Sequence, residues 1–133
     1  MGIMGGQIGD PNAVAFSAGN FTANASMSWT VASTTLNEYI STGGFMRCRI
    51  NVVNSTVGGT PSTALQVTIP NSATSSEAVQ VPCYIIDNST VAIGFAFTTA
   101  GGTLISISKV AGANWSSSTS ATTVFVDIMF RIK

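Results

Sequence analysis

The sequence predicts an all-β fold, an antiparallel β-sandwich or jelly roll of about eight strands with an extended N-terminal arm. Three observations lead to this prediction. Runs rich in Val, Ile, Thr, Phe and Tyr, which fit a pleated surface, alternate in polarity with period two. Small-residue turns separate these runs at short intervals, as in sandwiches and jelly rolls. No apolar period of 3.6 residues recurs, so we expect no amphipathic helix.

The turns divide the chain into short segments. Each turn consists of small residues that adopt tight backbone conformations, and glycine pairs supply the positive φ that such turns need. The breaks are Gly43-Gly44, Gly58-Gly59, Asn88-Ser89, Gly101-Gly102 and, more weakly, residues 112–114. Pro70 is a further stop, because proline has no amide to donate to a sheet.

Between these breaks we expect strands at residues 27–31, 36–41, 45–53, 64–69, 80–87, 90–98, 103–110 and 122–132. The third strand alternates clearly, with buried positions expected at Met46, Cys48, Ile50 and Val52. Residues 80–87 and 90–98 flank Asn88-Ser89 and predict a hairpin.

The last strand has one fully apolar face and one mixed face. The apolar face consists of Val124, Val126, Ile128, Phe130 and Ile132. The opposite face carries Asp127 and Arg131, but also Phe125 and Met129. We therefore expect this strand to meet a neighbouring subunit on its second face.

Residues 1–20 differ from the rest and are predicted to form an extended N-terminal arm, with the β-sandwich domain at residues 21–133. The arm is rich in glycine, contains Pro11 and shows little periodicity apart from a short strand expected at residues 13–16. Two interpretations stay open: a disordered terminus, or an arm that reaches a partner.

The composition favours association with other protein chains. Charged residues make up only 8% of the 133 residues, and the net charge is zero. A domain with so few charges tends to self-associate, so we expect part of its surface to be buried against another chain. The scarcity of clustered cations argues against nucleic acid. No signal sequence or membrane-spanning segment is recognisable, so we expect no export and no membrane partner.

The two cysteines, Cys48 and Cys83, lie in alternating apolar segments. Free cysteine behaves as a small hydrophobic residue, so we expect both to be buried free thiols. A Cys48–Cys83 disulfide is the alternative. A metal site is not expected, because two thiols without histidine make a poor ligand set.

Catalytic chemistry has little to build on in this chain. The absence of histidine excludes Ser-His-Asp and Cys-His machinery. None of the five carboxylates is paired in sequence as a glycosidase pair would suggest. We expect no enzyme activity and no cofactor.

Three residues are candidates for contact with a partner or ligand. Arg47 and Arg49 lie on one face of a predicted strand and could hold an anionic sugar or a carboxylate. The plainer interpretation, which we favour, is an exposed face or a salt bridge to Glu38 or Asp127. Trp115 lies in a polar loop and is the better candidate for an exposed aromatic residue, whereas Trp29 is expected to anchor a core or an interface.

Several segments resemble small trimeric β-sandwich or jelly-roll heads of phage and viral structural proteins, found on tail fibres, head fibres and as capsid decoration. The segments are residues 28–31, Tyr39, Gly44, residues 56–62, residues 65–70 and the closing strand 124–132. The likeness spans roughly residues 27–132 and includes no catalytic signature.

The resemblance implies a homotrimer on the virion surface, assembled in the host cell cytoplasm, with major capsid or tail proteins as partners. No fibre-forming region precedes the domain, which favours a capsid decoration protein attached partly through its N-terminal arm. The alternative is a receptor- or glycan-binding head of a phage tail or head fibre, in which strand-connecting loops carry specificity.

Overall fold

A computed structural model describes residues 11–33 and 36–133, and it confirms the all-β prediction. The strands are β1 (Asn12–Ala13), β2 (Phe21–Ala23), β3 (Met27–Thr30), β4 (Leu36–Thr42), β5 (Phe45–Gly59), β6 (Ala64–Thr68), β7 (Val79–Asp87), β8 (Thr90–Thr98), β9 (Leu104–Lys109) and β10 (Ser118–Arg131). Short 3₁₀ turns η2 (Ala18–Asn20), η3 (Pro70–Ser72) and η4 (Val110–Gly112) connect some of them. Across these described ranges, no helix has the length and apolar character needed to cross a bilayer.

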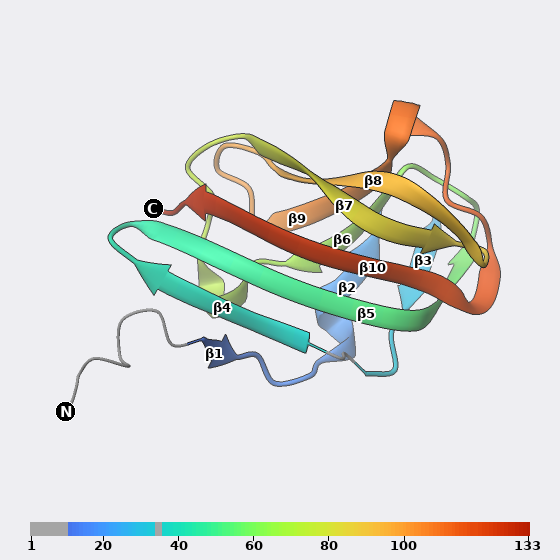
Figure 1. Cartoon of the computed structure of the whole chain (residues 1–133), viewed down its shortest axis with the longest axis horizontal. Helices are drawn as coiled ribbons and strands as arrows, with labels where there is room; N and C mark the ends of the chain where they lie inside the picture. Colours follow the sequence, from blue (N-terminus) through green and yellow to red (C-terminus); the bar gives the residue numbers. More distant parts are fainter. Residues whose placement is uncertain (1–10, 34–35) are drawn as a thin grey trace.

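The strands form one antiparallel sheet that curls until its two halves face each other, a sandwich of jelly-roll type. The order is β1-β4-β5-β10-β7-β8-β9-β6-β2, and β3 pairs with the far end of β5. In Figure 1 the long strands β4, β5 and β10 lie in front, with β2, β6 and β9 behind them. The core fills the space between these two layers.

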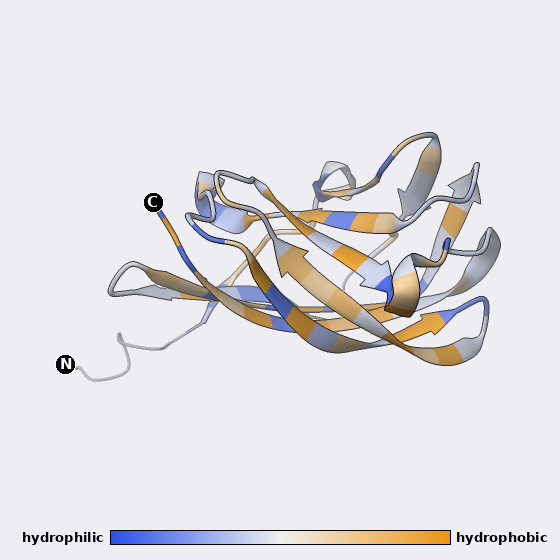
Figure 2. Cartoon of the chain, turned by 90° about the horizontal axis from the view of Figure 1, so that it is seen from above, coloured by the Kyte–Doolittle hydropathy of each residue, from blue (hydrophilic) through white to orange (hydrophobic). Residues whose placement is uncertain are grey.

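The predicted alternation decides which side chains enter that core. Met46, Cys48, Ile50 and Val52 of β5 are all buried, as the sequence predicts. Val124, Val126, Ile128 and Phe130 of β10 are buried beside them, while Ile132 is only partly buried. Figure 2 shows the resulting alternation of hydrophobic and hydrophilic positions along the strands. Each fully buried aliphatic side chain contributes about 1.5–3 kcal/mol, which makes this pairing the centre of the fold.

The β5–β10 pair is longer than predicted at both strands. The register runs from Phe45 opposite Arg131 to Val52 opposite Val124, then shifts irregularly around Thr122. Asn54 has φ 54° at this irregularity, and beyond it Ser55 turns into the core. Its hydroxyl accepts a hydrogen bond from Trp29 Nε1 at 2.8 Å and donates to the Thr122 carbonyl at 2.7 Å. Trp29 is therefore a core anchor, and a β-bulge lets polar residues extend the strand.

The β7–β8 hairpin is confirmed. Asp87 pairs with Thr90, and the two loop residues Asn88 and Ser89 have φ of 48° and 65°. Positive φ at both loop positions gives a type I′ turn, whose twist matches that of the strands it joins. This tight turn fixes which side chains of β7 and β8 share a face.

Residues 1–10 of the predicted arm lie outside the described residues. The described part of the arm follows the domain closely: Asn12 and Ala13 pair with Tyr39 and Glu38 of β4, as Figure 1 shows. The Phe16 ring stacks on the Phe21 ring with 6.0 Å between centroids. The short strand thus lies at Asn12–Ala13, slightly earlier than the predicted residues 13–16.

Candidate assembly surface

Most of the exposed large hydrophobic residues lie on the side of the sheet that points away from the core, along β5, β10, β7 and β8. We call this side the outer face. Because side chains alternate, the outer face carries the odd-numbered residues of β8 and the even-numbered residues of β7. In β10 it carries the odd-numbered residues from 125 to 131. The outer face has a charged half over β4, β5 and β10 and an apolar half over β10, β7 and β8.

The charged half is a neutral ladder of four side chains. Arg47 and Asp127 form a two-pronged ion pair, with Nε–Oδ1 at 2.9 Å and Nη2–Oδ2 at 2.7 Å. Arg49 Nε lies 3.9 Å from the same carboxylate, and Glu38 stands opposite Arg49 in register. The hydrogen bonds from Arg47 lower the pKa of Asp127, and the same carboxylate raises the pKa of Arg47.

The expected ion pair to Asp127 is thus present, and both arginine side chains remain about half exposed. A guanidinium already paired with a carboxylate has less to offer an anionic ligand. The proposed partner contact of Arg47 and Arg49 stays a prediction.

The apolar half centres on an aromatic pair that bridges two strands. Tyr84 of β7 lies opposite Phe125 of β10, with ring centroids 5.6 Å apart. On the other side Tyr84 lies opposite Ile93, and Ile86 lies opposite Val91. We call the set the apolar patch; it consists of Val53, Tyr84, Ile86, Val91, Ile93 and Phe125.

These side chains are exposed to a degree that is unusual for their type. The exposed fractions are 44% for Tyr84, 40% for Phe125, 61% for Val91 and 62% for Ile93. Multiplied by the usual surface areas of these side chains, the exposed fractions give about 500 Å² of apolar surface for the patch. This is near the upper end for the largest patch of a typical monomer. A patch of this size marks an interaction surface more often than a chance exposure.

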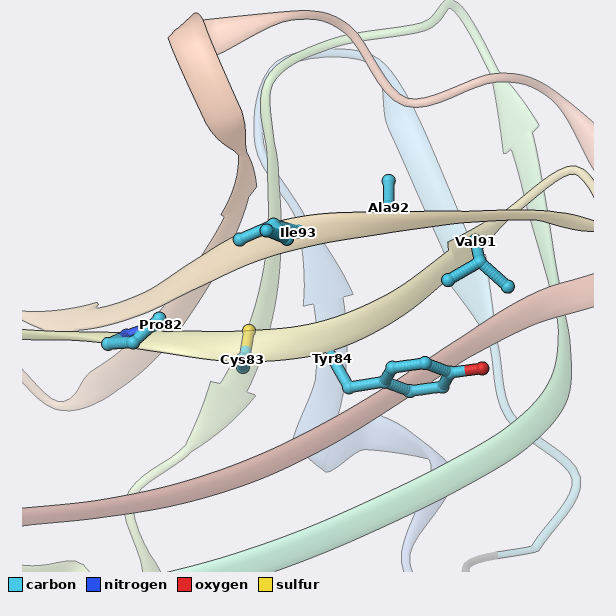
Figure 3. Close-up of a pocket in the computed structure, with 6 residues that line it drawn as sticks. All are labelled: Pro82, Cys83, Tyr84, Val91, Ala92 and Ile93. Atoms are coloured by element: carbon cyan, nitrogen blue, oxygen red, sulfur yellow. The ribbon is translucent and has the colours of Figure 1, made fainter.

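Two shallow hollows indent the apolar patch. One, of about 510 Å³, lies over the β7–β8 hairpin between Pro82, Tyr84, Val91 and Ile93 (Figure 3). The other, of about 570 Å³, lies over β5 and β10 and is lined by Val53, Tyr84, Ile86 and Phe125. Tyr84 belongs to both linings, so its side chain lies between the two hollows.

Trp115, the better of the two candidates for an exposed tryptophan, is buried. Trp115 is 0% exposed; its Nε1 donates to the Ile107 carbonyl at 3.2 Å and its amide to the Ser62 carbonyl at 2.8 Å. Residues 110–114 are exposed, but Asp87 ties the residues on either side of Trp115's loop, Lys109 and Ser116, to the domain. The Asp87 carboxylate accepts from Lys109 Nζ at 2.6 Å and from the Ser116 amide at 3.0 Å. Trp115 is a core residue and cannot stack on a ligand in this conformation.

Both cysteines are buried free thiols, as predicted. Burial raises the pKa of Cys48 to about 12, with a smaller contribution from the charge of Asp127. Burial likewise raises the pKa of Cys83 to about 11. Neither forms the thiolate needed for nucleophilic or metal chemistry near neutral pH.

The polar groups inside the domain serve its structure. Throughout residues 11–33 and 36–133, each buried side-chain nitrogen and oxygen has a hydrogen-bond partner. The same residues contain no group of three or more side chains able to hold a metal ion. Ser75, for example, donates to the Glu77 carbonyl at 2.6 Å and contacts the Thr98 hydroxyl at 3.2 Å. These networks tie neighbouring strands together.

Comparison with known proteins identifies no relative. No protein-family model matches the chain, and neither a curated protein nor a solved structure matches it at a significant level.

Proposed function

We propose that the chain is a virion structural protein, a homotrimeric capsid decoration protein attached to the shell partly through its N-terminal arm. The observation that supports this proposal best is the apolar patch on a domain in which only 8% of residues are charged. The largest apolar patch of a protein is often a functional surface, and a surface with few charges favours association. A protein that works by assembly needs the surface exposed until its partner arrives.

The proposed mechanism is mechanical. Each domain adds buried contact area across neighbouring shell subunits, so that opening the shell requires re-exposing more apolar surface, at about 25 cal/mol per Å². The long antiparallel pairing of β5 with β10, with its buried inner face, suits this role. No catalytic step is involved.

The alternative of a receptor- or glycan-binding head loses its best aromatic residue, because Trp115 is buried. The charged half of the outer face also offers an anionic sugar little, since Asp127 already occupies the Arg47 guanidinium. We therefore keep the decoration protein as the proposed function.

Co-sedimentation with purified capsids that lack the chain tests this proposal. We expect the full chain to pellet with capsids in a saturable manner. A variant without residues 2–10, which keeps β1, should bind markedly more weakly. A control in which residues 2–10 become a Gly/Ser segment of equal length separates the arm's sequence from its length. If the full chain stays in the supernatant, the decoration role is wrong; if the deletion variant binds normally, the arm has no part in attachment.

A further inference from the structure

We infer that the apolar patch is the contact surface for a second copy of this chain. The inference deepens the proposed function, on which it rests, by naming the surface through which the subunits associate. Four features favour a second copy: the area of the patch, its chemistry, the charge balance of the outer face and the shape of the patch.

The area suits a protein partner. A standard interface buries about 800 Å² on each partner, of which somewhat more than half is apolar. The apolar patch supplies about 500 Å², and the charged ladder beside it supplies a polar rim. An interface of ordinary size and composition therefore needs little apolar surface beyond the patch itself.

The chemistry argues against a lipid or nucleic-acid surface. Either surface is anionic and selects for free Lys and Arg around the apolar residues. Here the neighbouring cations Arg47 and Arg49 share the carboxylate of Asp127. The patch itself contains no charged residue, and its centre is a Tyr–Phe pair, of the residue types that dominate the centres of protein interfaces.

The charge balance favours a second copy over a different protein. The ladder of Glu38, Arg47, Arg49 and Asp127 carries two charges of each sign, and Arg131 adds one positive charge where it lies over the Phe45 ring at the end of β10. Two such faces therefore repel each other only weakly. The whole chain is also neutral, which removes the long-range repulsion that keeps charged monomers apart. A dedicated partner of opposite charge would call for a strongly charged face, and this face has a single excess positive charge.

The shape of the patch also suits a second copy. Tyr84 helps to line two hollows at once, and exposed apolar side chains such as Ile93 stand beside them. A second copy offers both an apolar side chain to enter a hollow and a hollow to receive one. Tyr84 is then the anchor residue, buried at the centre of the contact, with Ile93 and Phe125 packed around it.

Sedimentation velocity of the free chain, without capsids, tests the inference. We compare wild type with Tyr84→Lys and Ile93→Lys from about 1 to about 100 μM, a range in which interfaces of ordinary strength assemble. The matched control is Val110→Lys, which introduces the same charge at a residue that is 52% exposed and lies outside the patch. Thermal unfolding confirms that each variant is folded, and the second patch variant serves if the first does not fold.

We expect wild type and Val110→Lys to sediment as the same multiple of the 13.6 kDa chain. Each patch variant should sediment as a monomer, with its dissociation constant raised by about 100-fold or more, as for an interface hot spot. A wild type that remains monomeric throughout overturns the inference, as does a folded Tyr84→Lys that assembles normally. Either result concerns only the contact between copies. Attachment to capsids is tested by the separate co-sedimentation experiment, so the two proposals can fail independently.

Discussion

Replacing Asp87 by Asn tests the clamp by which this carboxylate ties Lys109 and Ser116, on either side of the exposed residues 110–114, to β7. The Asp87 side chain is 5% exposed and pairs with Lys109, whose side chain is 21% exposed. Asn retains the size of the side chain and one acceptor oxygen for the Ser116 amide. It removes the negative charge, so Lys109 loses its counter-ion while remaining mostly buried.

The expected loss of stability depends on the contacts that Lys109 keeps in the variant. Removing one partner of a buried ion pair costs about 3–5 kcal/mol, because the remaining charge stays desolvated. Lys109 retains the Asn114 carbonyl at 3.2 Å and some contact with water, which sets the cost near the lower end. We expect a loss of about 3 kcal/mol in the free energy of unfolding, or about 10 °C in Tm for a domain of this size.

Urea unfolding followed by tryptophan fluorescence measures this loss, since both Trp29 and Trp115 are buried in the native state. The matched variants are Lys109→Met and the double variant Asp87→Asn/Lys109→Met. The double variant should be more stable than the sum of the single losses by about 1–3 kcal/mol, because the pair is lost as a unit. A cost below about 1 kcal/mol for Asp87→Asn, or simple additivity, would refute the clamp.

Three further predictions concern the core, a turn and the surface ion pair. Cys48 and Cys83, with pKa values raised to about 12 and about 11, should resist alkylation in the folded protein at pH 8 and react once it is unfolded in urea; rapid native labelling would show the core to be open. Gly59→Ala places a Cβ 2.3 Å from the Ser26 carbonyl at φ 72°, so it should lower stability by about 2–3 kcal/mol, whereas Gly101→Ala at φ 80° meets no neighbour and should cost about 1 kcal/mol; equal costs in urea titrations would contradict this. Because the pKa of Asp127 is lowered in the folded state, its small contribution to stability is present at neutral pH and lost as the pH falls through that lowered value. The Tm difference between wild type and Asp127→Asn should therefore shrink in acid, and a difference that grows would be inconsistent with the ion pair.

The strands were predictable wherever one face alone is buried. The alternation along β5 and β10 predicts the burial of Met46 and Val126, because a one-residue shift would place every apolar side chain in water. The Asn88-Ser89 turn was equally legible, since few residue pairs adopt positive φ twice in succession. The exposure of Phe125 and Met129 on the second face of β10 also follows from the alternation.

The extension of β5 beyond residue 53 was not predictable from local pattern. Asn54, Ser55 and Thr56 resemble a loop in sequence, and Ser55 enters the core only because Trp29 and Thr122 satisfy its hydroxyl. These partners lie far away in the chain. The burial of Trp115 was not predictable for the same reason: its polar neighbours suggest exposure, but Asp87, distant in sequence, ties the adjacent Ser116 to the domain. The one available signal was the size of the indole itself, which rarely stays in water without a ligand.

The apolar patch was visible in the sequence only in part. Tyr84, Ile93 and Phe125 come from three strands, and their adjacency depends on the order β10-β7-β8. Sequence periodicity assigns a side chain to a face but does not say which strands are neighbours. The patch therefore emerges when the strand order is known, and it gives a location to the self-association that the low charge content suggested.

Hydroxyl-radical footprinting measures the central feature of this account directly, because it reports the solvent exposure of Tyr84, Phe125 and Met129 in the assembled protein. We expect oxidation of Tyr84 and Phe125 to fall several-fold between dilute and concentrated solutions. Exposed Phe16, which lies outside the outer face, should keep its rate. An assembled protein in which Tyr84 and Phe125 oxidise as fast as in the free chain would contradict the proposed contact between copies.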